Sequence, residues 1–465
     1  MERRRVDRVL VIGLDCATPQ FVFGPERFDL PNLHELMRRG CWGRLESCHP
    51  PITVPAWSVM TAGKDPGTLG FYGFRNRRDY SYDPMVTANA TAVRDERVWD
   101  ILSRNGKKVV VLGVPQTYPP NPVNGWLVSG FLAPDTRSDY AYPKSLKREI
   151  EAAAGEYVID VKDFRTDDKD GLLERLYALM ANRFAIARFL IEQKPWDFFM
   201  MVEMGLDRLH HGFWKFCAND HPMFQPGNPY ENVIRDFYRS VDREVGGLLD
   251  VVGDETAILV VSDHGAKSMR GGICVNQWLV NNGLLTLHDR LDGPKRIEDC
   301  HIDWAKTSVW SSGGYYARMF FNVKGREPQG VIPPDEYEAF RDQLAEAIKA
   351  MPDHNGEPLR NRVVRPQEVY RAVNGVAPDL IVYFGDLAWR AVGPVGFENI
   401  YTFENDTGPD DANHDCYGIF IMDDRVERGG REVQNLHLMD VAPTILDLLG
   451  VEIPEDMQGK VITGI

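Results

Sequence analysis

The residues best suited to chemistry follow an apolar run at 257–261, where the chain reads Ser262-Asp263-His264-Gly265. The run predicts a buried strand, and the glycine allows a turn that brings the carboxylate and the imidazole toward one point. Oxygen and nitrogen donors side by side suit a divalent ion such as zinc. The alternative is an Asp and a His that only cap a strand-to-helix turn. The metal hypothesis therefore depends on partners from other strand ends.

Other predicted strand ends and loops supply such partners, namely Asp15, Asp207, His211 and His414. Asp207 and His211 are four residues apart, so a helix would place both on one face. On a surface helix they would be an ordinary polar pair. Together with Asp263 and His264, the set contains three carboxylates and three imidazoles. That is enough for two ions with three protein ligands each, which is the usual number for catalytic zinc.

Thr53 is the candidate nucleophile. Prolines precede it, and the segment from Ala56 onward predicts a helix, so Thr53 lies near a helix N-terminus where free N–H groups favour an anion. An N-capping threonine would explain the position equally well. Two ions ~4 Å apart can stabilise the attacking and the leaving oxygen of a phosphoryl displacement. A hydroxyl beside such an ion loses its proton more easily and can attack phosphorus.

These side chains need a scaffold that brings strand ends together. Apolar runs alternate with amphipathic stretches, which is typical of a parallel sheet with its site at the carboxyl edge. We predict an α/β fold with an open, mostly parallel central sheet flanked by helices and with a smaller α+β insertion. The expected parts are a core at 1–272, the inserted subdomain at 273–375 and the second part of the core at 376–465.

The expected elements follow from the same patterns of apolar residues. Strands are expected at 8–15, 108–113, 196–203, 257–261, 315–323, 379–384 and 417–422. Helices are expected at 31–39, 98–104, 172–192, 230–250, 276–284, 334–350 and 440–449.

The composition of the 465 residues limits the partners. Lys and Arg number 53 and Asp and Glu 68, which gives a net charge of −15, and no basic run breaks this balance. Binding of a nucleic-acid polymer needs a basic face, so no such binding is expected. A small phosphorylated substrate stays compatible, because a metal ion can supply positive charge locally.

The cysteines and the N-terminus indicate a compartment. The seven cysteines are scattered and lack C-x-x-C spacing, which fits reduced intracellular thiols. The charged N-terminus leads into a short apolar run that Asp15 interrupts, which is unlike a signal peptide or a membrane span. We expect a cytoplasmic protein without membrane association, and the oligomeric state stays open.

Several motifs, taken in order, resemble the type I phosphodiesterase/nucleotide pyrophosphatase family of the alkaline phosphatase superfamily. They are Val-Ile-Gly-Leu-Asp15, Thr53-Val-Pro-Ala-Trp, Asp207-x-x-x-His211, Ser262-Asp263-His264-Gly265, His414-x-x-x-Gly418-Ile-Phe and the closing stretch from Met439 to Gly450. The likeness extends from about residue 8 to residue 461.

The resemblance implies a hydrolase of phosphodiester or pyrophosphate bonds with two divalent ions, commonly zinc, whereas some relatives take manganese, iron or calcium. It assigns one ion to Asp15, Asp263 and His264, with Thr53 bridging toward it, and the other to Asp207, His211 and His414. It also implies that Thr53 attacks phosphorus and forms a covalent phospho- or nucleotidyl-threonine that water releases.

Departures from relatives refine the substrate. Sulfatases of the superfamily have an Arg four residues after their Cys or Ser, and here position 57 is Trp, which argues against sulfatase chemistry. No Arg or Lys adjoins Thr53, and a phosphodiester carries one negative charge less than a monoester, which favours a phosphodiesterase. Asn76 is a candidate for the asparagine that relatives place near the phosphate.

Two alternatives stay open. A phosphomonoesterase or a phosphoglycerate-mutase-like phosphoryl transferase on the same scaffold would need cationic side chains from the insertion. Four are available, namely Arg318, Lys324, Arg326 and Arg371. A non-catalytic binder of phosphate ligands would not need a nucleophile at Thr53.

Overall fold

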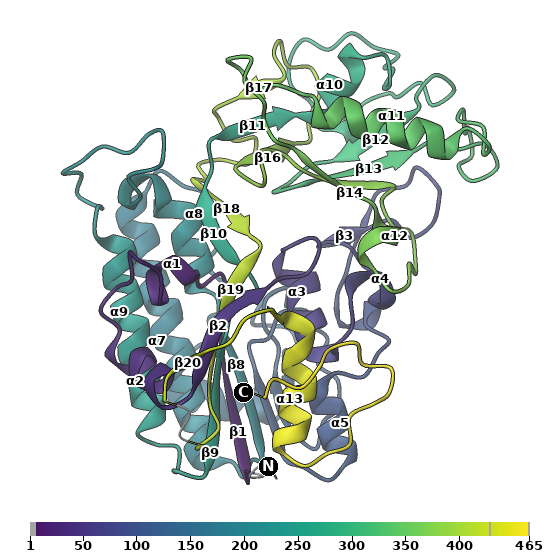
Figure 1. Cartoon of the computed structure of the whole chain (residues 1–465). Helices are drawn as coiled ribbons and strands as arrows, with labels where there is room; N and C mark the ends of the chain where they lie inside the picture. Colours follow the sequence, from purple (N-terminus) through teal and green to yellow (C-terminus); the bar gives the residue numbers. More distant parts are fainter. Residues whose placement is uncertain (1–5, 427–428, 464–465) are drawn as a thin grey trace.

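The computed structural model describes residues 6–426 and 429–463, and its largest unit is a 10-stranded, mostly parallel sheet (Figure 1). The bounds, in spatial order, are β20 Arg431–Glu432, β2 Cys41–Glu46, β19 Tyr417–Asp423, β9 Thr256–Val261, β1 Arg8–Leu14, β8 Phe198–Glu203, β5 Val109–Leu112, β6 Gly125–Val128 and β7 Ala141–Tyr142, and β21 Leu436–His437 pairs with β2. The strands from β9 to β6 run parallel, whereas β19 is antiparallel to both of its neighbours. The predicted α/β fold is confirmed.

The central strands of this sheet end level with one another. Gly13 of β1 pairs with Val202 of β8 and with Val261 of β9. These strands are almost wholly apolar and buried, as expected for parallel strands with helices on both faces. The residues that follow them in the chain therefore meet at one edge of the sheet.

Helices cover both faces of the sheet (Figure 1). One group is α2 Pro31–Arg39, α7 Lys169–Gln193, α8 Gly205–Cys217 and α9 Val233–Leu249, and the other is α3 Thr53–Ala62, α5 Val98–Arg104 and α13 Val441–Leu448. The other elements of the core are α1 Pro19–Val22, α4 Pro66–Leu69, α6 Leu146–Ala154, the 3-10 helices η1 Ala90–Ala92 and η3 Leu438–Asp440, and the hairpin of β3 Arg75–Asn76 with β4 Val86–Thr87. The first group packs along α9, and the second packs around α13.

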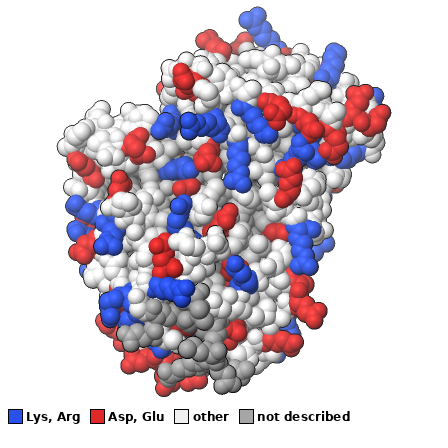
Figure 2. Space-filling view, in the orientation of Figure 1, with Lys and Arg blue, Asp and Glu red and all other residues white. Residues whose placement is uncertain are grey.

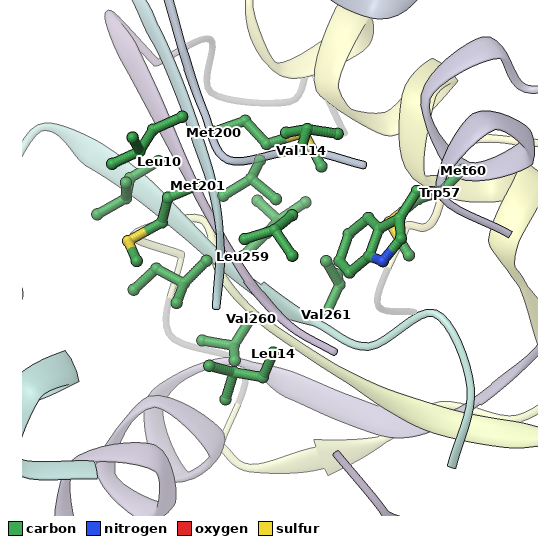
Figure 3. Packing of buried hydrophobic residues seen from close by; sticks show 14 of the residues in the cluster. Leu10, Leu14, Trp57, Met60, Val114, Met200, Met201, Leu259, Val260 and Val261 are labelled. Atoms are coloured by element: carbon green, nitrogen blue, oxygen red, sulfur yellow. The ribbon is translucent and has the colours of Figure 1, made fainter. Parts of the chain in front are cut away.

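The hydrophobic core brings α3 close to the sheet. Figure 3 shows Trp57 and Met60 of this helix beside the strand residues Val260 and Val261. Gly13 makes the approach feasible, because a Cβ at this position would lie 2.5 Å from Trp57 Cη2. The close contact places the N-terminal turn of α3 over the end of β1.

The insertion has two small sheets and a hydrophobic cluster of its own. One sheet contains β16 Trp389–Val392, β11 Gly271–Cys274 and β17 Tyr401–Thr402, and the other contains β12 Val309–Ser312, β13 Ala317–Phe321, β15 Leu380–Tyr383 and β14 Arg362–Val364. Its helices are α10 Val275–Asn281, η2 Ile297–Asp299, α11 Tyr337–Lys349 and α12 Pro366–Val369. Figure 1 shows this unit stacked on the end of the core where the site lies.

One predicted boundary is wrong. The strand expected at 379–384 was placed in the second part of the core, 376–465, but β15 pairs with β13 and β14 of the insertion. The next strand, β16, pairs with β11 of the insertion, and the chain rejoins the central sheet only at β19. A short apolar strand is buried in either sheet, so its sequence does not indicate which partner it pairs with. The predicted ends at 1–5 and 464–465 lie outside the described residues.

The outer surface has mixed charge. Lys and Arg side chains are interspersed with Asp and Glu on the face in Figure 2. Among the described residues, no helix combines the length and the apolar character that crossing a membrane requires.

Candidate active site

One cluster, called the strand site here, forms where β1 and β9 end. It consists of Asp15, which follows β1, and of Asp263 and His264, which follow β9. His264 Nε2 lies 3.9 Å from Asp15 Oδ1 and 3.1 Å from Asp263 Oδ2. All three side chains are completely buried. The parallel register of β1 and β9 thus brings together residues that are almost 250 positions apart, since Cys16 N donates to Asp263 Oδ1 across 247 positions.

The second cluster, called the helix site, consists of Asp207, His211 and His414. The helix α8 begins directly after β8, so Asp207 and His211 lie on one of its faces, as the spacing predicts. His211 Nε2 lies 3.4 Å from Asp207 Oδ1 and 3.3 Å from His414 Nε2. His414 Nε2 lies 3.6 Å from Asp207 Oδ1.

The two sites adjoin through a short antiparallel pair of strands. His414 lies on β18 (Ala412–Asp415), which pairs with β10 (Gly265–Ser268), the strand that follows His264. The rings of His264 and His414 stack with centroids 3.8 Å apart. All six predicted ligands are therefore gathered in one place.

Both clusters fit a divalent ion. In each cluster, donor atoms from all three residues lie within 4.8 Å of one another, and ligand atoms ~2.1 Å from a tetrahedral ion would be roughly 3.4 Å apart. Within the described chain, the buried oxygens Asp15 Oδ1, Asp207 Oδ1 and Asp263 Oδ2 have no hydrogen-bond partner. Buried oxygens of this kind are costly without a partner, and a cation at each cluster would satisfy them.

The histidine rings are also oriented in a way that suits a metal ion. Each Nδ1 lies beside an oxygen, at 3.2 Å from Gly265 O for His264, 2.9 Å from Pro51 O for His414 and 2.8 Å from Asp410 Oδ1 for His211. An Nδ1–H that donates to such an oxygen leaves the lone pair on Nε2. The three Nε2 atoms then face the clusters as potential ligands.

Thr53 is the first residue of α3 and is 2% exposed. Its Oγ1 lies 3.4 Å from His264 Nε2. The N-cap of α3 is Ile52, so the threonine hydroxyl is not the capping group that the sequence left as an alternative. The hydroxyl thus lies beside the strand site, at a helix N-terminus where an anion is favoured.

A cavity of about 670 Å³ opens in front of Thr53. Thr53 and all three members of the helix site line it, whereas the members of the strand site do not. Aromatic and apolar side chains from the core and from the insertion also line it, among them Ile52, Phe74, Phe131, Phe164, Tyr315 and Tyr316. The insertion therefore forms part of the enclosure around the nucleophile.

Sequence reasoning missed the residues that hold the ligands in place. Asp410 lies beside His211 and accepts from Arg165 Nε at 2.8 Å and from the Tyr315 hydroxyl at 3.1 Å. Trp57 Nε1 donates to Asp15 Oδ2 at 2.7 Å. The only signal for Asp410 was its place in the polar loop before His414, and Trp57 stood in a quoted motif without an assigned role.

The two sites differ in their electrostatics. Burial, followed by the charges of nearby aspartates, raises the pKa of Asp15 and of Asp263 well above the usual range. Burial alone would also raise the pKa of Asp207, but His211 and Arg208 together hold it well below that range. Burial alone would lower the pKa of His211, but Asp410 and Asp207 raise it to about 9.

Some predicted residues are not brought to the site. The Asn76 side chain bonds within its own loop, because it accepts from Tyr72 N at 2.7 Å and donates to Gly73 O at 2.9 Å. Asn76 and Arg371 line a second cavity, of about 870 Å³. Arg326 pairs with Asp379 at 2.8 Å, and neither it nor Lys324 lines the cavity of Thr53. Of the four cations considered, only Arg318 reaches that cavity.

Known proteins share this architecture. The structure of human ectonucleotide pyrophosphatase/phosphodiesterase 5 is similar, with a TM-score of 0.55 and 12% identity over 97% of this chain and 96% of that one. The murine protein gives a TM-score of 0.54 and 11% identity over 97% of both chains, in one case as an inactive variant in complex with AMP. Among curated proteins, none matches the sequence.

The sequence itself matches the family model of type I phosphodiesterase/nucleotide pyrophosphatase over residues 9–410. This range covers most of the chain and includes Thr53, the strand site and two members of the helix site. His414 lies just beyond the matched range. The chain therefore belongs to the type I phosphodiesterase/nucleotide pyrophosphatase family and is a hydrolase.

Proposed function

We propose that the protein is a metal-dependent hydrolase that cleaves phosphodiester or pyrophosphate bonds through a covalent phospho-threonine at Thr53. The observation that carries this proposal is the set of three unpartnered carboxylate oxygens, buried in two adjoining ligand clusters next to the Thr53 hydroxyl. A binder of phosphate ligands would have no need for a buried hydroxyl at this position.

The strand site and the helix site would each hold one divalent ion. Nitrogen and oxygen donors, three from each cluster, suit zinc best, and manganese, iron and calcium are the other candidates. When bound, such ions supply positive charge that lowers the pKa of a nearby hydroxyl or water and offsets the charge of phosphoryl oxygens.

The chain's own groups account for the remaining steps. Thr53 Oγ1 forms a bond to phosphorus, and the bond from phosphorus to the leaving oxygen breaks, so that the leaving group departs with the electron pair. The first N–H groups of α3, which begins at Thr53, would favour the negative charge of a phosphoryl group bound there. Water then cleaves the phospho-threonine and restores the hydroxyl.

The substrate class is a small phosphorylated compound. The cavity of about 670 Å³ is large enough for a nucleotide-sized ligand, and its wall mixes aromatic and charged side chains. A structural neighbour was solved with AMP, which supports nucleotides as the first compounds to test. A cytoplasmic location is part of the proposal, because the seven cysteines are scattered and lack C-x-x-C spacing, which fits reduced thiols.

The test is a rate assay on the zinc- and manganese-loaded protein with bis-p-nitrophenyl phosphate and p-nitrophenyl phosphate. The Thr53→Ala variant should retain two ions by metal analysis and lose activity by about a thousand-fold or more, because the nucleophile is gone. Thr61→Ala is the matched control. It removes another buried hydroxyl of α3, and this hydroxyl donates to Trp57 O. Full activity in Thr53→Ala would contradict the nucleophile assignment.

The alternative of a phosphomonoesterase or mutase-like transferase retains one supporting observation, which is the presence of Arg318 in the cavity. A monoester carries an additional negative charge that such a cation could neutralise. Faster turnover of p-nitrophenyl phosphate than of the diester would favour this alternative. Faster turnover of the diester would support the main proposal.

A further inference from the structure

The cavity of Thr53 is unusually rich in arginine. Six arginines line it, and four of them have a carboxylate partner of their own. These four pairs are Arg208 with Asp160 at 2.8 Å, Arg165 with Asp410 at 2.8 Å, Arg390 with Asp406 at 3.1 Å and Arg296 with Glu298 at 3.6 Å. The charge of most of the arginines in the wall is thus already balanced by the protein.

The remaining two, Arg75 and Arg318, have no carboxylate within ion-pair distance in the described part of the chain. Arg318 lies on β13 of the insertion and is 7% exposed. Its guanidinium donates from Nη1 to Arg75 O at 2.5 Å and from Nη2 to Ser312 Oγ at 3.1 Å. Arg318 Nη2 also lies 3.6 Å from Met85 Sδ, so all three of these acceptors are neutral.

Other arginines in the same region have carboxylate partners. Arg77, two residues after Arg75, is buried and pairs with Glu327 at 3.2 Å. The neighbouring Arg326 pairs with Asp379 at 2.8 Å. A buried guanidinium without a counter-charge is costly, and burial together with Arg75 lowers the pKa of Arg318. Both the other arginines of the cavity wall and these nearby arginines have carboxylate partners, so the missing carboxylate is specific to Arg75 and Arg318.

We propose that Arg75 and Arg318 form an anion subsite that binds a second phosphate of the substrate, next to the phosphate that Thr53 attacks. The inference rests on the proposed function, since it takes the cavity of Thr53 as the site of hydrolysis. The subsite selects phosphoanhydride diesters, in which two phosphates are adjacent, over simple phosphodiesters, which have one. A bidentate guanidinium contact is well suited to a phosphate group.

The reaction on such a substrate is balanced by one water molecule. The bond from Thr53 Oγ1 to the attacked phosphorus forms as the hydroxyl loses its proton to solvent, the anhydride P–O bond breaks, and the leaving phosphate monoester takes the electron pair. The attacked phosphorus keeps its ester group on the threonine. Water then attacks this phosphorus, the Oγ1–P bond breaks and Oγ1 regains a proton, so the products are two phosphate monoesters.

The experiment compares ADP-ribose, a phosphoanhydride diester, with bis-p-nitrophenyl phosphate. In Arg318→Gln and in Arg75→Gln, the ratio of kcat/KM for ADP-ribose to kcat/KM for the simple diester should fall at least ten-fold. Arg318→Lys should recover part of the ratio because it keeps the positive charge. The matched control is Arg371→Gln, an exposed arginine of the insertion that lines the other cavity, and its ratio should equal that of the wild type.

A binding measurement supplies an independent readout. In a Thr53→Ala background, the Kd of metal-loaded protein for ADP-ribose should rise at least ten-fold when Arg318→Gln is added. Arg75 is exposed, so Arg75→Gln gives the same test without the risk of misfolding.

An unchanged ratio and an unchanged Kd in both variants would overturn the subsite. A loss confined to p-nitrophenyl phosphate would also overturn it, because the arginines would then act on the attacked phosphate itself. If the wild-type protein hydrolysed neither diester, the proposed function would fail, which is a result distinct from failure of the subsite alone.

Discussion

The strand site and the helix site are both built from aspartate and histidine but differ in what surrounds them. Asp15, Asp263 and His264 lie at the ends of core strands, are completely buried and do not line the cavity. The members of the helix site come from α8 and β18 and all line the cavity. The comparison indicates that one site is part of the core, whereas the other faces the cavity.

The two sites also differ in the charged groups that contact them. Asp207 of the helix site accepts from Arg208 Nη1 at 2.6 Å, and His211 is paired with Asp410. The strand site holds two aspartates, and the donors to them, Trp57 Nε1 and Cys16 N, are both neutral. The charge of Asp207 is therefore offset by a neighbouring arginine, whereas among the described residues no cationic side chain donates to the aspartates of the strand site.

The largest expected effect is on activity, and it is the same for both sites. His264→Ala and His414→Ala should each lose one bound ion and reduce the hydrolysis rate by roughly a thousand-fold or more, because two ions act as a unit. Metal analysis and the diester assay measure both quantities. His301→Ala is the control, since it removes an exposed imidazole that also lies beside an aspartate. Normal metal content and rate in either site variant would remove that residue from the site.

The next effect is on the free energy of unfolding, and it has opposite signs at the two sites. In metal-free protein at pH 8, Asp207→Asn should lower the free energy of unfolding by about 3–5 kcal/mol, because it weakens a buried pair with Arg208. Asp263→Asn should instead raise it, because burial disfavours the charged carboxylate at this position and an amide cannot ionise. Urea unfolding of both variants after chelation measures the difference. Equal losses in the two variants would contradict the distinction.

A smaller effect on stability is expected for Glu203, the last residue of β8, which lies just before the helix α8. Glu203 accepts from Gly205 N at 2.7 Å at the start of α8, and burial raises its pKa to about 7. Because this pKa lies above the ordinary value, Glu203 stabilises the fold most below pH 4.5 and the contribution is lost as the pH rises through 7. Glu203→Gln should therefore be more stable than the wild type at pH 8, on the order of 2–3 kcal/mol, and similar to it at pH 4.

Unfolding of the Glu203→Gln variant at both pH values checks this prediction. The exposed Glu26→Gln substitution is the control and should change neither value. An equal difference between Glu203→Gln and the wild type at pH 4 and pH 8 would show that Glu203 does not titrate in this range.

Much of this architecture could be predicted because the ligands directly follow strongly apolar strands. Asp15 and Asp263 end runs that can only be buried strands, and the parallel arrangement then requires the strand ends to meet. The four-residue spacing of Asp207 and His211 also predicts that they share one face of a helix, and both lie in α8. Local patterns were sufficient for these residues.

The contacts that support the ligands could not be predicted in this way. Asp410 lies 199 positions from His211, and nothing in either segment indicates the pairing. Likewise, β15 was assigned to the core because a four-residue apolar strand looks the same in any sheet. The charge balance of Arg318 depends on which carboxylates fold near it, so only the three-dimensional structure reveals that it lacks one.

The most direct test of the central claim is the stereochemical course of hydrolysis at phosphorus. A phosphorothioate diester of one configuration, hydrolysed in oxygen-18 water, gives a product whose configuration can be assigned. Each in-line displacement inverts the phosphorus centre, so attack by Thr53 followed by attack of water predicts net retention. Net inversion would show that water attacks the substrate directly and would contradict a phospho-threonine intermediate.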